Sequence, residues 1–345
     1  MPVILRLRSI IPPRPWTTSW GEYRAMLKVG IIGAGNMGRV HTSGFEQLSQ
    51  TQVVAVTDTN PEAAERLAHQ TGAKVYPDVA GLLSDADIDI VAVCTPTVHH
   101  YDAVVQTARA GKHIFCEKPL ARTLEEGRKM LCAVESAGVK FMVGHVLRFF
   151  PEYRRTKELI DSGSVGRPGI ARLSRMGVFP AGWYGDFQQS GGLTLDLLIH
   201  DFDFLNWCFG KPQRVYAQGL NQKERAEHVD YALVLVRYKN GVIAHVEGSW
   251  AIPEGWYTKF EIAGDGGLID FDSRKTAPVT LHTKQRGTVQ ESPLEESPYL
   301  SELRHFVECV LQNREPEITG QDALEALKVS LAAVESIQCG KAITP

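Results

Sequence analysis

The regular alternation of short apolar runs with helical stretches, which begins at Lys28, constrains the fold of this chain most strongly. Five runs have the length and composition of buried strands: KVGIIG, VVAVTD, DIVAVCT, HIFCEK and KFMVGH. Strands that alternate with helices predict a parallel sheet covered on both faces. Helices are expected over 61–71 and 98–110, and a capping box of Thr123 and Glu126 opens a further one that ends near Gly138. Residues 27–147 are therefore predicted to form a doubly wound α/β domain.

From residue 148 onward the pattern changes to consecutive strands. A helix-like segment at 196–209 precedes five β-rich runs: RVYAQGL, YALVLVRY, VIAHVEGSW, TKFEIAG and GLIDF. Turn signals at 239–241 and 264–267 separate neighbouring runs, which indicates hairpins. Two final helices are expected over 299–312 and 322–338. Residues 148–345 are therefore predicted to form a second α/β domain with a large, mostly antiparallel open sheet, which would serve substrate binding and oligomerisation.

Composition favours a small-molecule partner. The 345 residues are 43% hydrophobic and 22% charged, as in ordinary globular proteins, and no apolar run has the ~18 residues needed to span a bilayer. The formal net charge of -3 gives no reason to expect nucleic acid or membrane partners. The six cysteines form no CxxC pair and no zinc-like spacing, which fits reduced thiols in a cytoplasm.

Residues 1–26 stand apart from the predicted domains. Arginines and prolines interrupt any apolar core that a secretory signal would need, and no small-residue cleavage site follows. Met26 comes directly before the first strand, so a start site placed too far upstream would explain this N-terminal extension. An ordered or targeting arm is the alternative.

A glycine-rich loop follows the first predicted strand and opens a helix. In the sequence GAGNMG, Gly33 would make the tight turn, Gly35 would admit a pyrophosphate, and Gly38 would let helix and strand pack closely. Asn36 and Met37 complete the loop. Phosphates would then lie at the helix N-terminus, where free N–H groups favour negative charge. A plain strand-to-helix turn is disfavoured because the rest of the βαβ unit is present.

Asp58 ends the second strand, twenty residues after Gly38. A carboxylate there accepts hydrogen bonds from the adenosine ribose and repels a 2′-phosphate, and no basic residue follows at once, so NAD is favoured over NADP. The alternative role, a cap for the helix that starts at Pro61, suits Asn60 better.

Lys118 stands at the end of the strand HIFCEK and is followed by Pro119. Proline restricts the preceding residue to extended geometry, which would project the lysine from the carboxyl edge of the sheet, where ligands gather. Oxidation of a hydroxyl needs a group that takes its proton and a cation that tolerates the developing oxyanion. A structural ion pair with Glu117, or an exposed lysine, remains an equal alternative on spacing alone.

Asp196 and His200 are four residues apart, which places them on one face of a helix. Together they could form a proton relay. Asp201 and Asp203 follow within an apolar stretch, which is costly unless these groups line a cavity or pair. A buried histidine satisfied by a neighbouring carboxylate is the alternative, and a metal site is discounted because no third ligand has convincing spacing.

Taken together, these motifs resemble the Gfo/Idh/MocA family, which includes glucose-fructose oxidoreductase and inositol dehydrogenase. The likeness covers nearly the whole chain after Met26. It rests on four segments: GAGNMGRVH at 33–41, CTPTVHHYDA at 94–103, EKPLA at 117–121 and GGLTLDLLIHDFD at 191–203. The pair of EKP and GGxxxDxxxH is specific, whereas the glycine loop alone would not be.

The resemblance implies roles for individual residues. Lys118 matches the family's EKP lysine near nicotinamide and substrate, and Asp196 and His200 match its D-x-x-x-H pair, with His200 as acid/base. Family members differ in whether lysine or histidine transfers the proton. The same comparison gives further contacts, with cofactor for Thr95, His100 and Glu117, and with substrate for Arg148 and Trp183, the latter in a loop with Tyr184.

Thr97 departs from the family pattern, in which asparagine is common, and this affects only a local cofactor contact. The family also implies a Rossmann domain joined to a domain whose open sheet packs against another subunit, so homodimers or homotetramers are expected.

The expected activity is hydride transfer between NAD and a secondary hydroxyl of a sugar, a cyclic polyol such as inositol, or a sugar derivative. One alternative is a tightly held NAD used for glycoside cleavage or sugar-to-sugar hydride exchange. Another is a non-catalytic NAD- or sugar-binding regulator, although such a module has no need of Lys118, Asp196 and His200 together.

Overall fold

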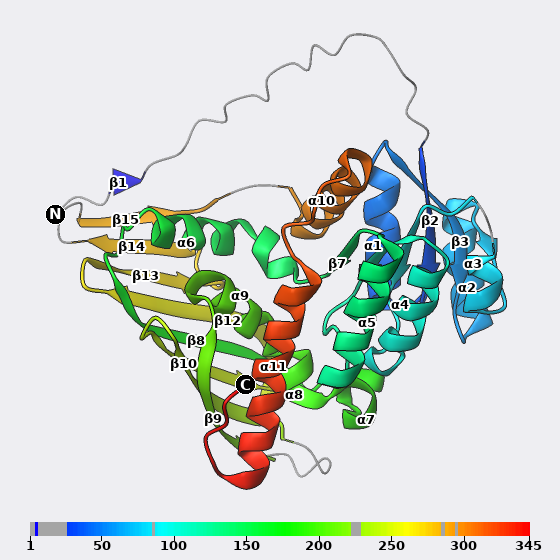
Figure 1. Ribbon diagram of the computed structural model, residues 1–345. Helices are drawn as coiled ribbons and strands as arrows, with labels where there is room; N and C mark the ends of the chain where they lie inside the picture. Colours follow the sequence, from blue (N-terminus) through cyan, green and yellow to red (C-terminus); the bar gives the residue numbers. More distant parts are fainter. Residues whose placement is uncertain (1–3, 6–25, 85–86, 222–228, 284–286, 294–295) are drawn as a thin grey trace.

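Two β-sheets with their attached helices make up the part of the chain that the computed structural model describes, which is residues 4–5, 26–84, 87–221, 229–283, 287–293 and 296–345 (Figure 1). Within these residues no helix is long and apolar enough to cross a membrane. The interpretation of residues 1–26 falls outside the described residues, apart from a two-residue strand, β1 (Ile4–Leu5), and Met26.

The first sheet is parallel throughout and has the order β4-β3-β2-β5-β6-β7. Its strands are β2 (Leu27–Ile32), β3 (Thr51–Thr57), β4 (Lys74–Val75), β5 (Ile90–Val93), β6 (His113–Cys116) and β7 (Phe141–Val143). The connecting helices are α1 (Asn36–Gln47), α2 (Pro61–Thr71), α3 (Val79–Leu83), the 3₁₀ turn η1 (Thr97–His99), α4 (His100–Arg109) and α5 (Leu124–Ala137). This arrangement confirms the predicted doubly wound sheet.

Local chemistry accounts for the helix boundaries in this sheet. The Asn60 side chain accepts hydrogen bonds from the first turn of α2, and Thr123 and Glu126 form the predicted reciprocal capping box at α5. The chain order reverses between β2 and β5, which are neighbours although β3 and β4 come between them in sequence. In an open α/β sheet, ligands bind at the carboxyl ends of strands beside such a reversal.

The second sheet confirms the predicted mostly antiparallel architecture. Its order is β1-β15-β14-β13-β12-β8-β11-β10-β9, and only the pairs β8–β11 and β1–β15 are parallel. Its longer strands are β8 (Pro168–Val178), β9 (Pro212–Leu220), β10 (Tyr231–Tyr238), β11 (Ile243–Ser249), β12 (Ala251–Gly264), β13 (Gly267–Asp272), β14 (Val279–Thr283) and β15 (Gly287–Glu291). The central strand β8 had no counterpart among the predicted runs.

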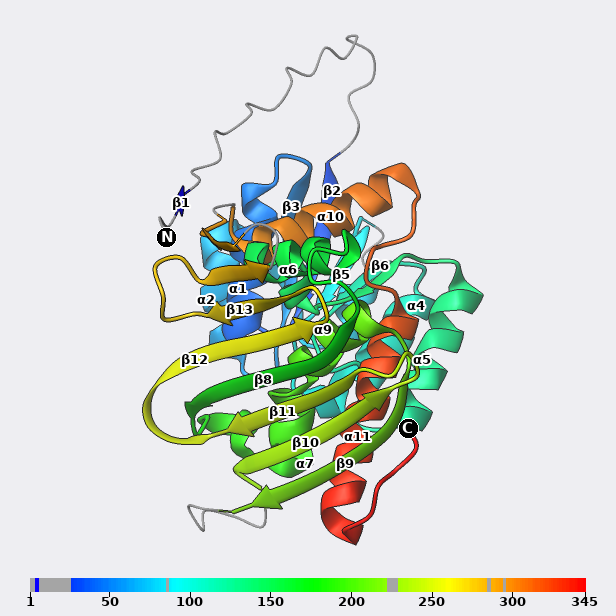
Figure 2. The same cartoon turned by 90° about the vertical axis from the view of Figure 1, so that its left-hand side faces the viewer.

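One face of this sheet carries helices and the other is open. Figure 2 looks onto the open face, and the helices lie behind it. The covering elements are η2 (Val146–Phe149), α6 (Pro151–Asp161), α8 (Gly192–Asp196) and α9 (Ile199–Phe209). The short elements η3 (Gly182–Gly185) and α7 (Phe187–Ser190) lie before α8, and α7 contacts η1 of the first half. Alternation along β10 sets the two faces apart, because Val234 and Val236 are fully buried whereas Leu235 between them is 41% exposed.

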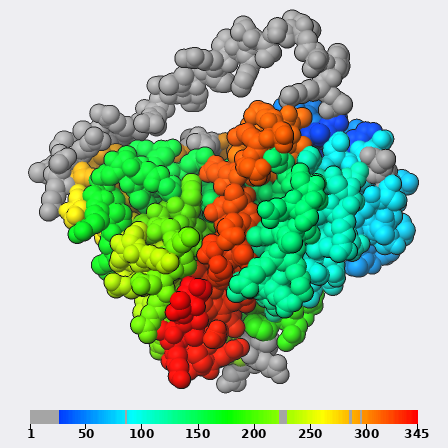
Figure 3. Space-filling model, in the orientation of Figure 1, coloured from blue at the N-terminus to red at the C-terminus, as the bar shows by residue number. Residues whose placement is uncertain are grey.

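The two C-terminal helices, α10 (Pro298–Gln312) and α11 (Gly320–Cys339), join the two halves. Leu303 and Phe306 of α10 lie in the same core cluster as Val29 of β2. Leu327 of α11 packs into the core of the first sheet, and Ala333, further along the same helix, packs into the core of the second. In Figure 3 these helices form the orange and red band between the halves. The domain boundary predicted at residue 147 remains a proposal. Helix α10 lies in the predicted second domain by sequence but packs on the first sheet.

Candidate active site

The glycine loop has the geometry that close backbone packing requires. Gly33 adopts φ 99°, and a Cβ atom there would lie 2.7 Å from the carbonyl oxygen of Cys94. A Cβ at Gly38 would lie 2.0 Å from the carbonyl oxygen of Gly33, so the loop and α1 can approach only without side chains. A Cβ at Gly35 would meet nothing within 4 Å. The loop is therefore closely packed at Gly33 and Gly38, and the space beside Gly35 is open.

The first turn of α1 suits an anion. Gly35 caps the helix without a side-chain hydrogen bond, and no acidic residue lies in that turn, so its N–H groups and the positive end of the helix dipole face outward. Asn36 is exposed and Met37 is half-buried at the same helix end. A cavity of about 390 Å³ runs from Asn36 along α1 to Tyr299 at the start of α10.

Asp58 is fixed beside this loop at the end of β3. Its Oδ2 accepts a hydrogen bond from the Ala34 N–H at 2.6 Å, and its Oδ1 accepts one from the Asn60 N–H at 2.7 Å. Asn60 caps α2 with its own side chain, as the sequence indicated. Asp58 therefore presents a negative charge next to the glycine loop, which is the placement that a ribose contact needs.

Two threonine hydroxyls without a hydrogen-bond partner lie just after β5, the strand next to β2. The Oγ1 atoms of Thr95 and Thr97, just after β5, are buried and make no hydrogen bond. Buried hydroxyls usually have a partner, so these atoms fit a ligand that brings hydrogen-bonding groups. The Gly33–Gly38 loop, Asp58 and Thr95 thus suit a dinucleotide in their chemistry.

His100 is placed differently from the expected cofactor contact. It is fully buried, with Nδ1 2.9 Å from the carbonyl oxygen of Pro119 and Nε2 3.0 Å from that of Thr95. Burial lowers its pKa, although the backbone bonds oppose this shift. His100 therefore links the turn after β5 to the Lys118–Pro119 segment, and its contact with the cofactor stays a prediction.

Glu117 forms a buried pair with His41, a residue to which the sequence reasoning gave no role. Glu117 Oε1 lies 2.6 Å from His41 Nε2, and Oε2 accepts the backbone N–H of Lys118 at 3.1 Å. Burial acts to raise the pKa of Glu117, but the bond to His41 and the charge of Lys118 outweigh it and lower that pKa. The signals available in the sequence were the histidine that ends GRVH and the acid directly after the strand at 113–116.

Lys118 and Asp196 meet across the boundary between the two sheets. The lysine Nζ donates hydrogen bonds to Oδ1 of Asp196 and to its backbone carbonyl oxygen, both at 2.8 Å. Their side chains are only 13% and 11% exposed. The partner of Lys118 is therefore Asp196, 78 residues away, and Glu117 bonds its backbone instead.

His200 does not sit on one continuous helix with Asp196, which corrects the expected geometry. The chain forms α8 up to Asp196 and α9 from Ile199, with Leu197 and Leu198 between them. His200 Nδ1 is buried without a partner, and both Asp196 Oδ1 and the Asp196 carbonyl oxygen accept hydrogen bonds from Lys118. Burial, and then the positive charges of Lys118 and Arg175, hold the pKa of His200 well below its ordinary value. At neutral pH His200 is therefore an uncharged imidazole able to accept a proton.

Two buried arginines explain the acidic residues that follow His200. Arg148 donates from Nε and Nη2 to both carboxylate oxygens of Asp203, at 2.9 and 2.7 Å. Arg175 of β8 binds Asp201 in the same bidentate way, at 2.7 and 2.8 Å. Arg148, the residue predicted to contact substrate, thus forms an ion pair with Asp203. Sequence reasoning missed Arg175 because it did not predict strand β8.

Trp183 and Tyr184 of η3 stack on each other, with ring centroids 3.9 Å apart. Both are half-buried. Burial raises the pKa of Tyr184, and the negative charges of Asp196 and Glu117 raise it further. The turn η3 packs against α8, which carries Asp196, and the substrate contact of Trp183 stays a prediction. Among the described residues, no group of three or more His, Cys, Asp or Glu side chains is arranged to hold a metal ion.

The chain is similar to known proteins over most of its length. Residues 27–145 match the model of an oxidoreductase family with an NAD-binding Rossmann fold, and residues 153–270 match the GFO/IDH/MocA C-terminal domain. The chain is 30% identical over 323 residues to myo-inositol 2-dehydrogenase of Thermotoga maritima, covering 90% of this chain and 96% of that one. It is 32% identical over 328 residues to 1,5-anhydro-D-fructose reductase of Ensifer adhaerens, covering 92% and 98%.

A solved structure supports the same assignment. The crystal structure of GenD2 from gentamicin A biosynthesis, in complex with NAD, has a TM-score of 0.85 and 25% sequence identity, and the match covers 96% of this chain and 99% of that one. The two matched models, which lie on the two sheets described above, account for most of the chain. The protein therefore belongs to the Gfo/Idh/MocA family of NAD-binding oxidoreductases.

Proposed function

We propose that this protein oxidises a secondary hydroxyl of a neutral sugar, cyclic polyol or sugar derivative, with NAD as the hydride acceptor. The observation that carries the proposal is the buried Lys118–Asp196 pair, whose neighbour His200 is kept uncharged. The relatives named for inositol and anhydrofructose chemistry support this substrate class. Inositol is the most concrete candidate.

The residues of the chain divide the work of binding and proton transfer. The Gly33–Gly38 loop and the start of α1 would hold the pyrophosphate, Asp58 the adenosine ribose, and Thr95 the part of the dinucleotide nearest β5. Bound there, the nicotinamide would supply the hydride acceptor. Asp58 favours NAD over NADP because its charge repels a 2′-phosphate.

Lys118 and His200 would act on the reacting hydroxyl. The Lys118 ammonium, fixed by Asp196, donates a hydrogen bond to the substrate oxygen and stabilises the negative charge that develops on it. The neutral His200 imidazole accepts the hydroxyl proton. The low pKa of His200 keeps it in the proton-accepting form, and the proximity of Lys118 is one cause of that low pKa. Asp196 therefore serves as a positioning residue for Lys118.

We also propose that the open face of the second sheet forms a homo-oligomer interface. Five large apolar side chains on that face are exposed by 37% to 62%: Ile170, Tyr216, Leu220, Leu235 and Ile243. Register places Ile170 beside Ile243, and Tyr216 beside Leu235, which gives a continuous patch. A cytoplasmic location is proposed on the six cysteines, all of which are free.

The test is NADH absorbance after mixing purified protein and NAD with inositols, aldoses, amino sugars and glycosides. Turnover with a neutral polyol, lost in Lys118→Ala, would support the proposal and name the substrate class. No signal from protein that binds NAD would count against exchangeable-NAD dehydrogenase activity. It would favour a permanently held cofactor or a binding role.

A further inference from the structure

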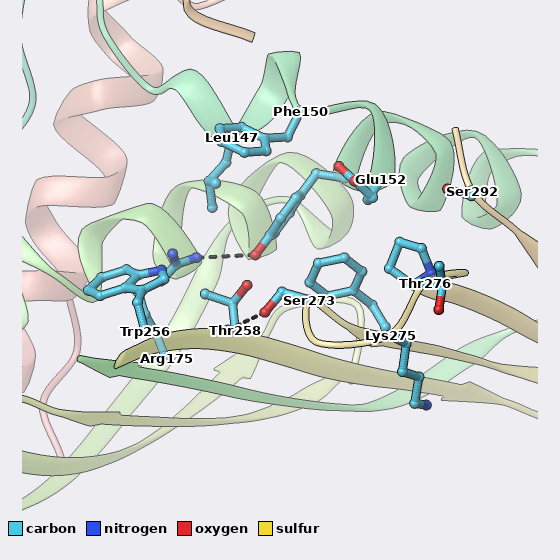
Figure 4. Close-up of a pocket in the computed structure, with 13 residues that line it drawn as sticks. Leu147, Phe150, Glu152, Arg175, Trp256, Thr258, Ser273, Lys275, Thr276 and Ser292 are labelled. Atoms are coloured by element: carbon cyan, nitrogen blue, oxygen red, sulfur yellow. Dashed lines mark hydrogen bonds between the residues drawn. The ribbon is translucent and has the colours of Figure 1, made fainter. Parts of the chain in front are cut away.

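A cavity of about 410 Å³ lies between α6 and the helix-covered face of the second sheet (Figure 4). Its size is within the range of small-molecule sites, roughly 300–1,000 Å³. None of Lys118, Asp196 and His200 lines it. Its walls combine aromatic rings, among them Phe150, Tyr153 and Trp256, with polar side chains.

Trp256 provides an aromatic platform at one end of this cavity. The indole lies against the backbone of β8 at Gly177, where a Cβ atom would come within 2.5 Å of the indole Cε3. The pairing of β12 with β8 shifts register just before Trp256, and Gly255 adopts φ 83° there, so the local backbone turns this residue. More than half of Trp256 remains exposed, at 55%. Such an aromatic surface suits the apolar face of a sugar ring.

The two cations that line the cavity are already neutralised. Arg175 is held by Asp201 and also donates to the Tyr153 hydroxyl at 3.2 Å, and Lys275 Nζ is paired with Asp270 at 2.6 Å. Both cations of the lining therefore have carboxylate partners. A phosphate or carboxylate ligand would find no unpaired cation here, and it would meet the acidic Glu152.

The remaining polar groups are those that recognise hydroxyls. Thr258, Ser273, Thr276 and Ser292 bring four side-chain hydroxyls, and Glu152 brings a carboxylate. Figure 4 shows Ser273 and Thr258 between the aromatic rings, with Thr276 and Ser292 toward the end opposite Trp256. Aromatic surface interspersed with hydroxyls fits a neutral, many-hydroxyl ring.

Two routes connect the cavity to the catalytic pair. Arg175 binds Asp201, which directly follows His200, and its charge contributes to the low pKa of His200. On the other side, the Phe150 ring lies 6.5 Å from that of Tyr299, which in turn lies 6.4 Å from His41, the partner of Glu117. The cavity is therefore linked by side-chain contacts to residues that adjoin His200 and Glu117.

We propose that this cavity binds the second ring of a two-ring neutral carbohydrate, whose first ring is oxidised at Lys118 and His200. This inference rests on the function proposed above and narrows its substrate class from single polyols to glycosides. Trp256 would stack on the second ring, while Glu152 and the threonine and serine hydroxyls would bind its hydroxyls.

The experiment compares kcat/KM for single-ring probes, myo-inositol and D-glucose, with that for two-ring probes, galactinol, maltose and cellobiose. The ratio of two-ring to single-ring kcat/KM should exceed one in the unaltered enzyme. In Trp256→Ala this ratio should fall about tenfold, the loss expected for one aromatic stacking contact. Thr276→Trp, which fills the far end of the cavity from an exposed position, should lower the ratio at least as much.

Tyr257→Ala is the matched control, because Tyr257 is the next residue of β12 and alternates to the opposite face of the sheet. Its ratio should stay as in the unaltered enzyme. An unchanged ratio in both Trp256→Ala and Thr276→Trp, with single-ring turnover intact, would overturn the second-ring site. A higher kcat/KM of the unaltered enzyme for single-ring probes than for two-ring probes would also overturn the second-ring site.

Ligand-detected NMR on the NAD-loaded protein separates this proposal from the proposed function. Binding of a disaccharide that weakens in Trp256→Ala, without any NADH formation, would retain the second-ring site and remove the dehydrogenase assignment. Absence of both disaccharide binding and turnover would overturn the second-ring site as well.

Discussion

The Lys118 ammonium lies 2.8 Å from the Asp196 carboxylate and equally close to the Asp196 backbone carbonyl oxygen. The lysine comes from the end of β6 in the first sheet, and the aspartate comes from α8 beside the second sheet. A cation held by two oxygens in a site only 13% exposed is oriented before substrate arrives. Each half of the molecule therefore supplies one member of this pair.

Replacement of Lys118 by Ala should reduce kcat by about 10² to 10⁴-fold, because the reacting oxygen loses its positioned cation. NAD affinity, measured by fluorescence titration, should change little. Lys129→Ala is the control, since that lysine pairs with Glu125 on the exposed side of α5. Loss of NAD binding together with activity would mean that Lys118 is needed for the structure of the site.

Replacement of Asp58 by Ala should raise the NADP/NAD ratio of kcat/KM, because the charge that repels a 2′-phosphate is removed. Affinity for both cofactors should also drop somewhat, since Asp58 holds the Ala34 N–H of the glycine loop. Asp58→Asn removes the charge and keeps one acceptor oxygen, which can serve the Ala34 N–H at the expense of the bond from the Asn60 N–H. An unchanged NADP/NAD ratio in both variants would reject the assignment of Asp58 to the ribose.

Replacement of Glu117 by Gln should lower the free energy of unfolding by about 2 kcal/mol at pH 7, the scale of a hydrogen bond to a charged group. The pKa of Glu117 is lowered in the folded state, so its stabilisation is complete above the unfolded pKa, roughly 4.3, and is lost as pH falls through the folded pKa. Urea denaturation should therefore show the difference between the two proteins shrinking below about pH 4.

Glu125→Gln, on the exposed face of α5, serves as the control for that experiment. A stability difference that grew on acidification would contradict the lowered pKa of Glu117.

His200 should titrate well below its ordinary range, because burial and the cations Lys118 and Arg175 disfavour the imidazolium form. A proton-accepting role then needs no deprotonation at neutral pH, so the acidic limb of kcat/KM should lie below pH ~6.5. The Cε1–H resonance of His200, followed by NMR against pH, should have its midpoint in the same region. A midpoint at or above pH ~6.5 would contradict this account.

Replacement of Leu235 by Asp should dissociate the proposed oligomer, because a charge would be buried in the centre of the apolar patch. Light scattering after gel filtration should show a reduced mass without loss of secondary structure. Val75→Asp changes an apolar residue that is 36% exposed, against 41% for Leu235, on the edge strand of the first sheet, and should leave the mass unaltered. A monomeric unaltered protein would remove the interface proposal outright.

Local patterns were sufficient for most elements of the fold. The helix over 61–71 was predicted with both ends correct, because Asn60, Pro61 and Gly72 provide cap, first turn and stop within the chain itself. The capping box of Thr123 and Glu126 acted in the same way. Strand β8 escaped prediction because arginines at 172 and 175 interrupt its apolar pattern, and one of them is buried only by virtue of Asp201.

The sequence by itself determined the parallel sheet and the mostly antiparallel sheet, the glycine loop, the acid after β3 and the presence of Lys118, Asp196 and His200, since these depend on residue type and short-range spacing. Only the tertiary structure decided their partners. Asp196 bonds Lys118 and not His200, because two residues interrupt the helix between α8 and α9. Glu117 meets His41, and Asp201 and Asp203 meet arginines from distant elements. The physical reason is that a buried charge must find a counter-charge wherever packing brings one, and sequence distance carries no information about that encounter.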